Sequence, residues 1–342
     1  MTDTLILGSY TKKESIGIYR ILFDSVQGEF STLEELIKED NPTYLSHSTN
    51  NILYSVTKEE NAGGLASYKQ QHDGTYQLLN KVTSEGAPPC YVAVDNNRQL
   101  VFDANYHKGT ISTYSIQPDG SLALADTVTH QGSGPHENQT IPHAHYADLT
   151  PDNRLVACDL GTDTVYTYDV SNKGHLTEIA TFHAQPGTGP RHLVFHQNQR
   201  TAYLFGELSS EVVVLDYDKI SGSFTEKQVI STLPDGYTGF NGGAAIRLSK
   251  DGCFLYVSNR GHNSIAVYKT SDHGRHLDLI QHISVEGDFP RDFDLTPDGH
   301  WLIVANQNTD NLTLFSRNVE TGLLTLSQKD IYAPEIVCVT FK

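Results

Sequence analysis

The sequence predicts an all-β fold, a seven-bladed β-propeller of four-stranded antiparallel blades. Three observations support this prediction. A strand-turn-strand frame recurs seven times, each full copy continues into a third apolar run that ends in an aromatic residue, and helical periodicity is nearly absent. Because no linker or low-complexity segment interrupts the repeats, we expect residues 1–342 to form a single propeller domain.

The repeated frame is clearest in GTGPRHLVFHQNQRTAYLFGE, residues 187–207. Two short apolar runs joined by a polar turn predict a hairpin, whose outer ends lie side by side. Arg191 and His192 should therefore lie near Glu207. The frame begins at Asn41, Pro88, His143, Gly189, Gly242, Phe289 and Ala333.

The third run of each full copy ends in tyrosine or phenylalanine. These residues are Tyr68, Tyr114, Tyr168, Tyr217, Tyr268 and Phe315. A fourth run usually follows, so each unit is a four-stranded meander of about 40 to 55 residues, which is the size of a propeller blade.

The last copy contains only one strand, APEIVCVTF, before the sequence ends at Lys342. The missing strands are present at the amino terminus, where DTLILGSY, IGIYRILF and EFSTLEELI supply three further runs. We therefore expect the carboxy-terminal strand to lie innermost in a blade whose other strands are amino-terminal. This pairing would close the ring and cover two sheet edges.

Charge argues against two classes of partner. The chain has 24 Lys and Arg against 41 Asp and Glu, a formal charge of -17, which opposes binding to nucleic acid or an anionic membrane. No segment approaches the roughly 20 apolar residues of a membrane helix, and the amino terminus has no basic region before an apolar stretch. We expect a cytoplasmic protein.

The cysteines fall in or beside apolar runs of four different repeats, without close C-x-x-C spacing. They are Cys90, Cys158, Cys253 and Cys338. This pattern predicts buried free thiols rather than a disulfide or zinc site.

Charged residues are predicted to converge at one mouth of the ring. The inner strand of each blade begins there, and the loop between the second and third strands returns there. Arg191, Arg260 and Arg291 occupy such positions and predict an anion-binding site, with Glu207 beside them. By contrast, Asp148, Arg247 and Asp294 share an inner-strand position typical of a structural ion network in the channel.

Two insertions lengthen blades at this mouth. GSGPHENQTIPHAHY carries His143 and His145, whose H-x-H spacing suits a metal but lacks a third ligand, so we predict no metal. STLPDGYTGFNGG offers Tyr237, Phe240 and Asn241 as a lid, or forms a plain surface loop.

Four motifs, in order and at blade spacing, resemble those of the seven-bladed lactonase family of bacterial 6-phosphogluconolactonases and fungal carboxymuconate-lactonising enzymes. They are PHAHYADLTPDNRLVACDLGTD, GPRHLVF with GEL, LYVSNRGHNSIAVY and FPRDFDLTPDGHWLIVANQNTDNLTLF. The resemblance implies a cytosolic enzyme that acts on a lactone without an organic cofactor. Its functional residues are similar to His143, Arg191, Glu207 and Arg260 here. NGGAAIR departs from the pattern because it lacks the reference proline, so the resemblance gives Arg247 no role.

Our leading hypothesis is hydrolysis of a small anionic lactone, 6-phospho-D-glucono-1,5-lactone, a step of the pentose phosphate pathway. Either His143 or Glu207 would activate water, and arginines would bind the anion. Neighbouring residues at the same strand ends are predicted to bind substrate: His145, His192, Asn259, Arg291 and Asn306. Two alternatives stay open, a carboxymuconolactone-type cycloisomerase or lyase and a non-catalytic propeller that binds a partner.

Overall fold

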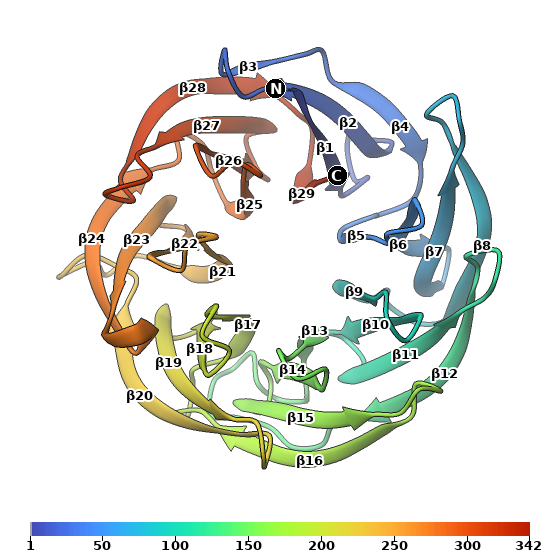
Figure 1. Cartoon of the computed structure of the whole chain (residues 1–342), viewed down its shortest axis with the longest axis horizontal. Coiled ribbons are helices and arrows are strands. Elements are labelled where there is room, and N and C mark those ends of the chain that lie inside the picture. Colours follow the sequence, from blue (N-terminus) through green and yellow to red (C-terminus); the bar gives the residue numbers. More distant parts are fainter. Residues whose placement is uncertain (1) are drawn as a thin grey trace.

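The structure is a computed structural model that describes residues 2–342, and these form seven antiparallel sheets arranged as blades around a central channel (Figure 1). Six sheets have four strands and the seventh has five. The described helical structure is limited to a single 3-10 turn, η1 (Asp272–Gly274). The predicted seven-bladed propeller is confirmed.

The first four blades are numbered from the amino terminus. Blade 1 contains β1 (Thr2–Ser9), β2 (Gly17–Asp24), β3 (Glu29–Phe30), β4 (Glu34–Lys38) and β29 (Ile336–Phe341). Blade 2 contains β5 (Leu45–His47), β6 (Ile52–Glu59), β7 (Ala62–Gln70) and β8 (Tyr76–Glu85). Blade 3 contains β9 (Tyr91–Asp95), β10 (Leu100–Asn105), β11 (Thr110–Ile116) and β12 (Leu122–Thr129). Blade 4 contains β13 (Ala144–Leu149), β14 (Leu155–Asp159), β15 (Thr164–Val170) and β16 (Leu176–His183).

The remaining blades follow the same order from the channel outward. Blade 5 contains β17 (Pro190–Phe195), β18 (Thr201–Gly206), β19 (Glu211–Asp218) and β20 (Ser223–Ser231). Blade 6 contains β21 (Gly242–Leu248), β22 (Phe254–Arg260), β23 (Ser264–Ser271) and β24 (His276–Ser284). Blade 7 contains β25 (Pro290–Leu295), β26 (Trp301–Asn306), β27 (Asn311–Arg317) and β28 (Leu324–Tyr332).

The carboxy-terminal strand closes the ring in the predicted way. β29 pairs antiparallel with β1, in the register Leu5 with Phe341 and Gly8 with Cys338. It is the innermost strand of blade 1, so both ends of the chain meet in one sheet (Figure 1). The edge of β1 is therefore paired rather than exposed.

The outer strand of blade 1 differs from the single predicted run. Two short strands, β3 and β4, pair with β2 instead, and residues 31–33 separate them. At the break, the backbone N–H of Ser31 donates to Leu22 O at 2.8 Å, while the Ser31 hydroxyl accepts the Leu22 N–H at 2.9 Å. The Ser31 hydroxyl thus takes the place of a backbone carbonyl as acceptor of the Leu22 N–H, and this interrupts the pairing of β2 with its outer strand.

Neighbouring blades are joined by a repeated hydrogen bond from the second strand. The hydroxyls of Tyr203 and Tyr256 donate to the carbonyls of Gly274 and Gly322 in the next blade, at 2.7 and 2.8 Å. Tyr54 does the same to a glycine of blade 3. Gly274 and Gly322 have φ of +84° and +76°, which side chains rarely adopt. This bond satisfies buried phenolic hydroxyls in an otherwise apolar core.

The cysteine prediction is correct for Cys158 and Cys338, which are buried free thiols. Cys90 is partly buried. Cys253 is exposed, and here the prediction is wrong. It lies in the turn before β22, where its N–H donates to Asp251 Oδ1 at 2.8 Å, so it precedes the apolar run rather than belonging to it.

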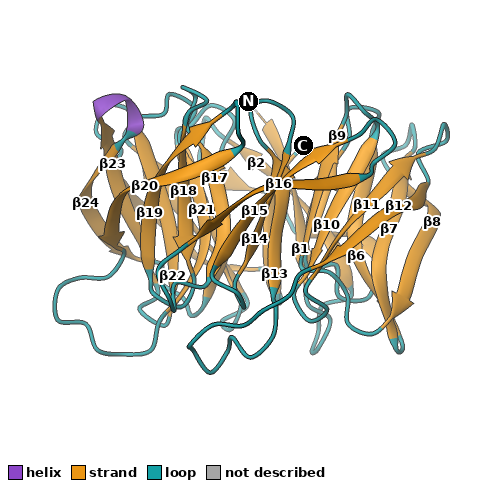
Figure 2. Ribbon diagram, turned by 90° about the horizontal axis from the view of Figure 1, so that it is seen from below, coloured by secondary structure: helices purple, strands orange, loops and turns teal. Residues whose placement is uncertain are grey.

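Both long insertions lie at one edge of the ring. The loops before β13 and β21 extend beyond the strands on the same side (Figure 2). In the second loop the Tyr237 hydroxyl donates to Phe240 O, and the Phe240 side chain is 72% exposed. Nowhere in residues 2–342 is there a helix with the length and apolar character that crossing a membrane requires.

Candidate functional site

The central channel opens into one cavity at each mouth. The larger, of about 540 Å³, lies where the inner strands begin, and we call it the arginine cavity. Its charged and imidazole lining includes Lys12, Lys58, His145, Glu207, Arg260 and Arg291. The smaller, of about 350 Å³, lies at the opposite mouth and is lined by Tyr44, Tyr91, Tyr146 and His192. We call it the tyrosine cavity.

Two buried arginines converge on one carboxylate at the arginine cavity. Arg191 Nε and Arg260 Nη2 each lie 3.0 Å from Glu207 Oε2. The Arg191 Nε–H is not aligned for a hydrogen bond, so that contact is chiefly electrostatic. The predicted proximity of Arg191 and Glu207, and of Glu207 and Arg260, is confirmed. We call these three residues the Glu207 cluster.

Small residues at the start of β21 let the arginines reach backbone carbonyls. Arg260 donates from Nε to Gly242 O at 3.2 Å and from Nη2 to Gly243 O at 2.6 Å. Arg191 Nη1 donates to Ala244 O at 2.5 Å. A Cβ on Gly243 would lie 2.7 Å from the carbonyl oxygen of Gly206. The segment NGGAAIR, which lacks the reference proline, therefore lies close to the backbone of β18. Its carbonyl groups hold both guanidinium groups in place.

The charges of the Glu207 cluster shift the pKa values of its members. Burial opposes ionisation of Glu207, but Arg260, Arg191 and Arg291 outweigh it, and the pKa of Glu207 is lowered. Burial, aided by Arg260 and Arg291 and opposed by Glu207, lowers the pKa of Arg191 to about 9. At neutral pH the carboxylate is therefore charged and Arg191 remains a cation.

The two histidines of the first insertion both contact Tyr106, which lines the arginine cavity. His143 stacks on Tyr106 with ring centroids 4.1 Å apart, and its Nδ1–H donates to Tyr106 O at 2.8 Å. This bond leaves Nε2 as the basic nitrogen. The centroid of His145 lies 5.9 Å from that of Tyr106.

His145 is held uncharged. Its side chain lines the arginine cavity and is buried, and its Nδ1 has no hydrogen-bond partner in residues 2–342. Burial lowers the pKa of His145 well below its usual value, and the charges of Arg191, Arg291 and Arg260 lower it further. A neutral imidazole beside several guanidinium groups offers a polar contact without adding charge.

Arg291 differs from the other arginines at this mouth. It lines the arginine cavity, yet no Asp or Glu within residues 2–342 forms an ion pair with it. Its guanidinium group lies over the ring of Tyr10, 5.8 Å from Cζ to the ring centroid. Arg291 is therefore available to an anion.

Three predicted substrate-binding residues do not line the arginine cavity. Asn259 is buried and donates from Nδ2 to Thr232 O at 2.8 Å, which ties a loop to β22. Asn306 donates from Nδ2 to Thr313 Oγ1, on the neighbouring strand β27, at 3.1 Å. His192 lies between the two cavities, 5.2 Å from the His145 ring, and faces the tyrosine cavity. Their hydrogen bonds and positions favour structural roles for these side chains.

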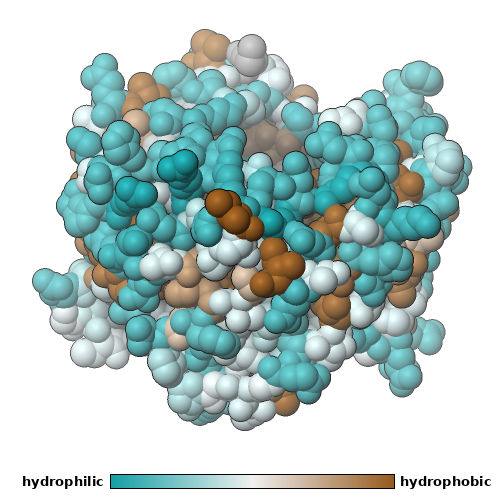
Figure 3. All heavy atoms as spheres, turned by 60° about the horizontal axis from the view of Figure 1, so that its bottom comes forward, coloured by the Kyte–Doolittle hydropathy of each residue, from teal (hydrophilic) through white to brown (hydrophobic). Residues whose placement is uncertain are grey.

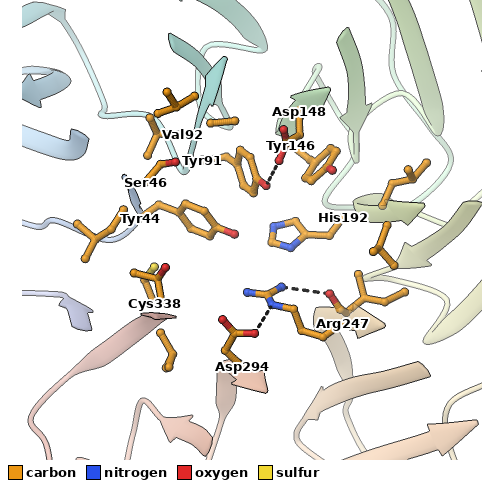
Figure 4. A pocket seen from close by; sticks show the side chains of 18 residues that line it. Tyr44, Ser46, Tyr91, Val92, Tyr146, Asp148, His192, Arg247, Asp294 and Cys338 are labelled. Carbon is orange, nitrogen blue, oxygen red and sulfur yellow. Dashed lines mark hydrogen bonds and ion pairs between the residues drawn. The ribbon is translucent and has the colours of Figure 1, made fainter. Parts of the chain in front are cut away.

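The tyrosine cavity contains the expected ion network in altered form (Figure 4). Arg247 pairs with Asp294 at 3.5 Å, as predicted, and also with Asp292 at 2.9 Å. Asp148 instead accepts the Tyr91 hydroxyl at 2.9 Å. Among the described residues Asp148 therefore stands outside the ion pairs of Arg247, and a tyrosine hydroxyl satisfies its carboxylate instead.

Sequence reasoning missed the two lysines of the arginine cavity. Lys58 precedes Glu59 and occupies in blade 2 the position that Asn105 and Asn259 take in their blades. Alignment of the repeats could therefore have placed Lys58 at this mouth. Lys12 lies in the loop between β1 and β2, the second-to-third-strand loop of blade 1, which spans residues 10–16 and is longer than its equivalent in blade 5, residues 207–210. Within the described chain, no group of three or more His, Cys, Asp or Glu side chains is arranged to hold a metal ion.

Comparisons with known proteins agree with this architecture. The family model described as "Lactonase, 7-bladed beta-propeller" matches residues 4–341. A crystal structure of a protein from Lactobacillus plantarum is 50% identical, with a TM-score of 0.98 and 100% of both chains covered. A periplasmic gluconolactonase of Pseudomonas aeruginosa is 31% identical, with a TM-score of 0.94 and coverage of 100% and 99%. A Bacillus subtilis protein named 6-phosphogluconolactonase is 46% identical over 209 residues, which are 61% of this chain and 60% of that one.

Proposed function

The chain belongs to the seven-bladed β-propeller lactonase family, and we propose that it hydrolyses 6-phospho-D-glucono-1,5-lactone to 6-phosphogluconate at the arginine cavity. The observation that carries this proposal is the charge of the cavity. Its lining contains four cations, Lys12, Lys58, Arg260 and Arg291, against the single carboxylate of Glu207, in a protein of formal charge -17. Such a local excess of positive charge favours an anionic ligand.

The shape of the site favours an enzyme over a binding scaffold. The volume of about 540 Å³ lies within the range of roughly 300–1,000 Å³ that is typical of small-molecule sites. The face drawn in Figure 3 does not include the mouth of this cavity; on it, hydrophilic residues predominate and hydrophobic ones form small separate patches. A protein-docking surface would expose a broader apolar area.

The proposed reaction needs a base and an oxyanion donor. A water molecule attacks the lactone carbonyl carbon and gives its proton to the base, the carbonyl oxygen becomes an oxyanion, and collapse of this intermediate expels the ring oxygen, which takes up a proton. Arg260 suits the donor role because its Nη1 makes no hydrogen bond to any group in residues 2–342, while Nε and Nη2 are held by backbone. This fixed guanidinium group is preorganised.

His143 is the better candidate for the base. Glu207 lies between two guanidinium groups that stabilise its charged form and lower its pKa, which weakens it as a proton acceptor. His143 Nε2 makes no hydrogen bond within residues 2–342. The ring is oriented by the Tyr106 carbonyl and stacks on the Tyr106 ring, which lines the cavity although His143 itself does not. We therefore assign proton transfer to His143 and the anchoring of Arg191 and Arg260 to Glu207.

A lactonase assay on the purified protein tests the proposal directly. 6-Phospho-D-glucono-1,5-lactone would be generated in place and acid release followed with a pH indicator, against spontaneous hydrolysis. We expect acceleration well above the uncatalysed rate. Unphosphorylated glucono-1,5-lactone and a carboxylated muconolactone serve as comparison substrates. If no lactone opens faster with the protein than without it, the proposal is wrong; turnover of the muconolactone alone would favour the cycloisomerase alternative.

Chelation should leave this activity unchanged. The proposed chemistry uses His143, Arg191, Glu207 and Arg260, and no step requires a Lewis acid. Activity would be measured before and after extended dialysis against a chelator, followed by chelator removal. The control is a second aliquot to which divalent ions are returned. A loss of activity that a divalent ion restores would place His143 and His145 in a metal shell instead.

A further inference from the structure

We infer that Lys12, Lys58 and Arg291 form a phosphate-binding subsite of the arginine cavity, an inference that rests on the proposed function. The three side chains come from blades 1, 2 and 7, whereas His145, Glu207 and Arg260 come from blades 4, 5 and 6. Blades 7, 1 and 2 are consecutive in the ring, as are blades 4, 5 and 6, and the two sets adjoin where blade 7 follows blade 6 (Figure 1). The cavity therefore has a catalytic wall and a second, cationic wall.

The three cations lack the partners that neighbouring cations have. Lys13, next to Lys12, pairs with Asp310 at 3.5 Å, and Lys81 pairs with Glu39 at 2.9 Å. Across residues 2–342, no carboxylate forms an ion pair with Lys12, Lys58 or Arg291. Unpaired positive charges that line one cavity repel each other, and a bound anion relieves that repulsion.

Tyr10 brings two of these cations together. Lys12 Nζ lies 4.0 Å from the Tyr10 ring centroid, and Arg291 Cζ lies 5.8 Å from the same centroid. An aromatic ring attracts cations but does not neutralise them. The ring thus holds an ammonium and a guanidinium group near each other without cancelling their charge.

A buried carboxylate fixes the loop that carries Lys12. Glu335 is 3% exposed and accepts the backbone N–H groups of Lys12, Lys13 and Ser15 at 3.0, 2.9 and 3.2 Å. The Glu335 carboxylate therefore interacts with the backbone of the loop and not with the Lys12 ammonium group. Glu335 is therefore a positioning residue that orders the loop and leaves the lysine charge to the cavity.

The number of cations suits a phosphate monoester. A phosphate group carries about -1.5 to -2 charge near neutral pH and offers three acceptor oxygens. An unphosphorylated sugar lactone carries no negative charge that could pair with the three cations. The Glu207 cluster already supplies donors for the lactone carbonyl, so the second wall is free to select the phosphorylated substrate.

The test is the double substitution K12A/K58A, with Lys13→Ala as the matched control. All three lysines are exposed, and Lys13 lies outside the cavity lining, so the variants should fold like the unchanged protein, which Tm measurements would verify. For the phosphorylated lactone we expect KM to rise at least about 10-fold in K12A/K58A, with kcat within about 2-fold. Kinetics with glucono-1,5-lactone, and both substrates with K13A, should stay unchanged.

Calorimetric titrations separate this inference from the proposed function, because they need no turnover. 6-Phosphogluconate should bind the unchanged protein and K13A, and K12A/K58A should weaken that binding at least about 10-fold. Inorganic phosphate should respond in the same direction and gluconate should not. If binding follows this pattern while no lactone is hydrolysed, the subsite stands and the proposed function falls. If K12A/K58A and K13A bind 6-phosphogluconate equally well, the subsite is wrong even where lactones are hydrolysed.

Discussion

Removal of residues 334–342 is expected to abolish soluble folding of the chain. The deletion takes away β29, the innermost strand of blade 1, and exposes the edge of β1 along the register from Leu5 to Gly8. It also removes the buried side chains of Ile336, Val337 and Val339. Burial of each such side chain contributes about 1.5–3 kcal/mol, so their loss alone approaches the 5–15 kcal/mol stability typical of a domain.

The deletion would be evaluated by soluble yield, size-exclusion chromatography and thermal unfolding. A chain lacking only Lys342 is the matched control, because this residue is exposed and follows the end of β29. It should behave like the full chain. A monomeric product of the longer deletion, with native β-sheet content and a cooperative transition, would contradict the assigned role of β29.

Most of the fold could be predicted because each blade repeats the same local pattern. The aromatic endings of the third runs and the truncated last copy were enough to give seven blades and the pairing of β1 with β29. The interrupted outer strand of blade 1 could not be predicted. The interruption arises because the Ser31 hydroxyl replaces a backbone carbonyl as hydrogen-bond acceptor. The pattern of apolar residues contains no information about such a replacement.

The candidate site could be predicted where position within a blade determines position at the mouth. This held for Arg191, Glu207 and Arg260, which meet in one ion cluster. Asn259 and Asn306 share the same strand-end position, but their amides donate to Thr232 O and Thr313 Oγ1, and neither lines the arginine cavity.

Lys12 shows a second limit of sequence reasoning. The loop that carries it is held by Glu335, which is more than 300 positions away in the chain. Their contact exists only because β29 closes blade 1 beside β1. Part of the cationic wall is therefore a consequence of ring closure, and no local motif of residues 10–15 indicates it.

Replacing His143 and Glu207 should separate proton transfer from substrate binding. His143→Asn keeps a donor toward the Tyr106 carbonyl but removes the basic Nε2, so kcat should fall by about 10²- to 10⁴-fold with little change in KM. Glu207→Gln keeps the shape of the side chain but removes the charge that holds Arg191 and Arg260. That variant should mainly raise KM and lower Tm, because two buried guanidinium groups lose their counter-charge.

Steady-state kinetics on the phosphorylated lactone measure this contrast, and His175→Asn is the matched control. His175 lies in the same blade, its side chain is 65% exposed, and it is not among the residues that line the cavity, so its replacement should leave both constants unchanged.

The reverse pattern, in which Glu207→Gln lowers kcat at constant KM and His143→Asn retains kcat, would identify the carboxylate as the base. Glu207 would then have to accept a proton despite two ion pairs at 3.0 Å that stabilise its charged form, which requires substrate binding to displace at least one arginine. Full activity in both variants would exclude these two side chains from the chemistry and would place the reacting groups elsewhere in the protein.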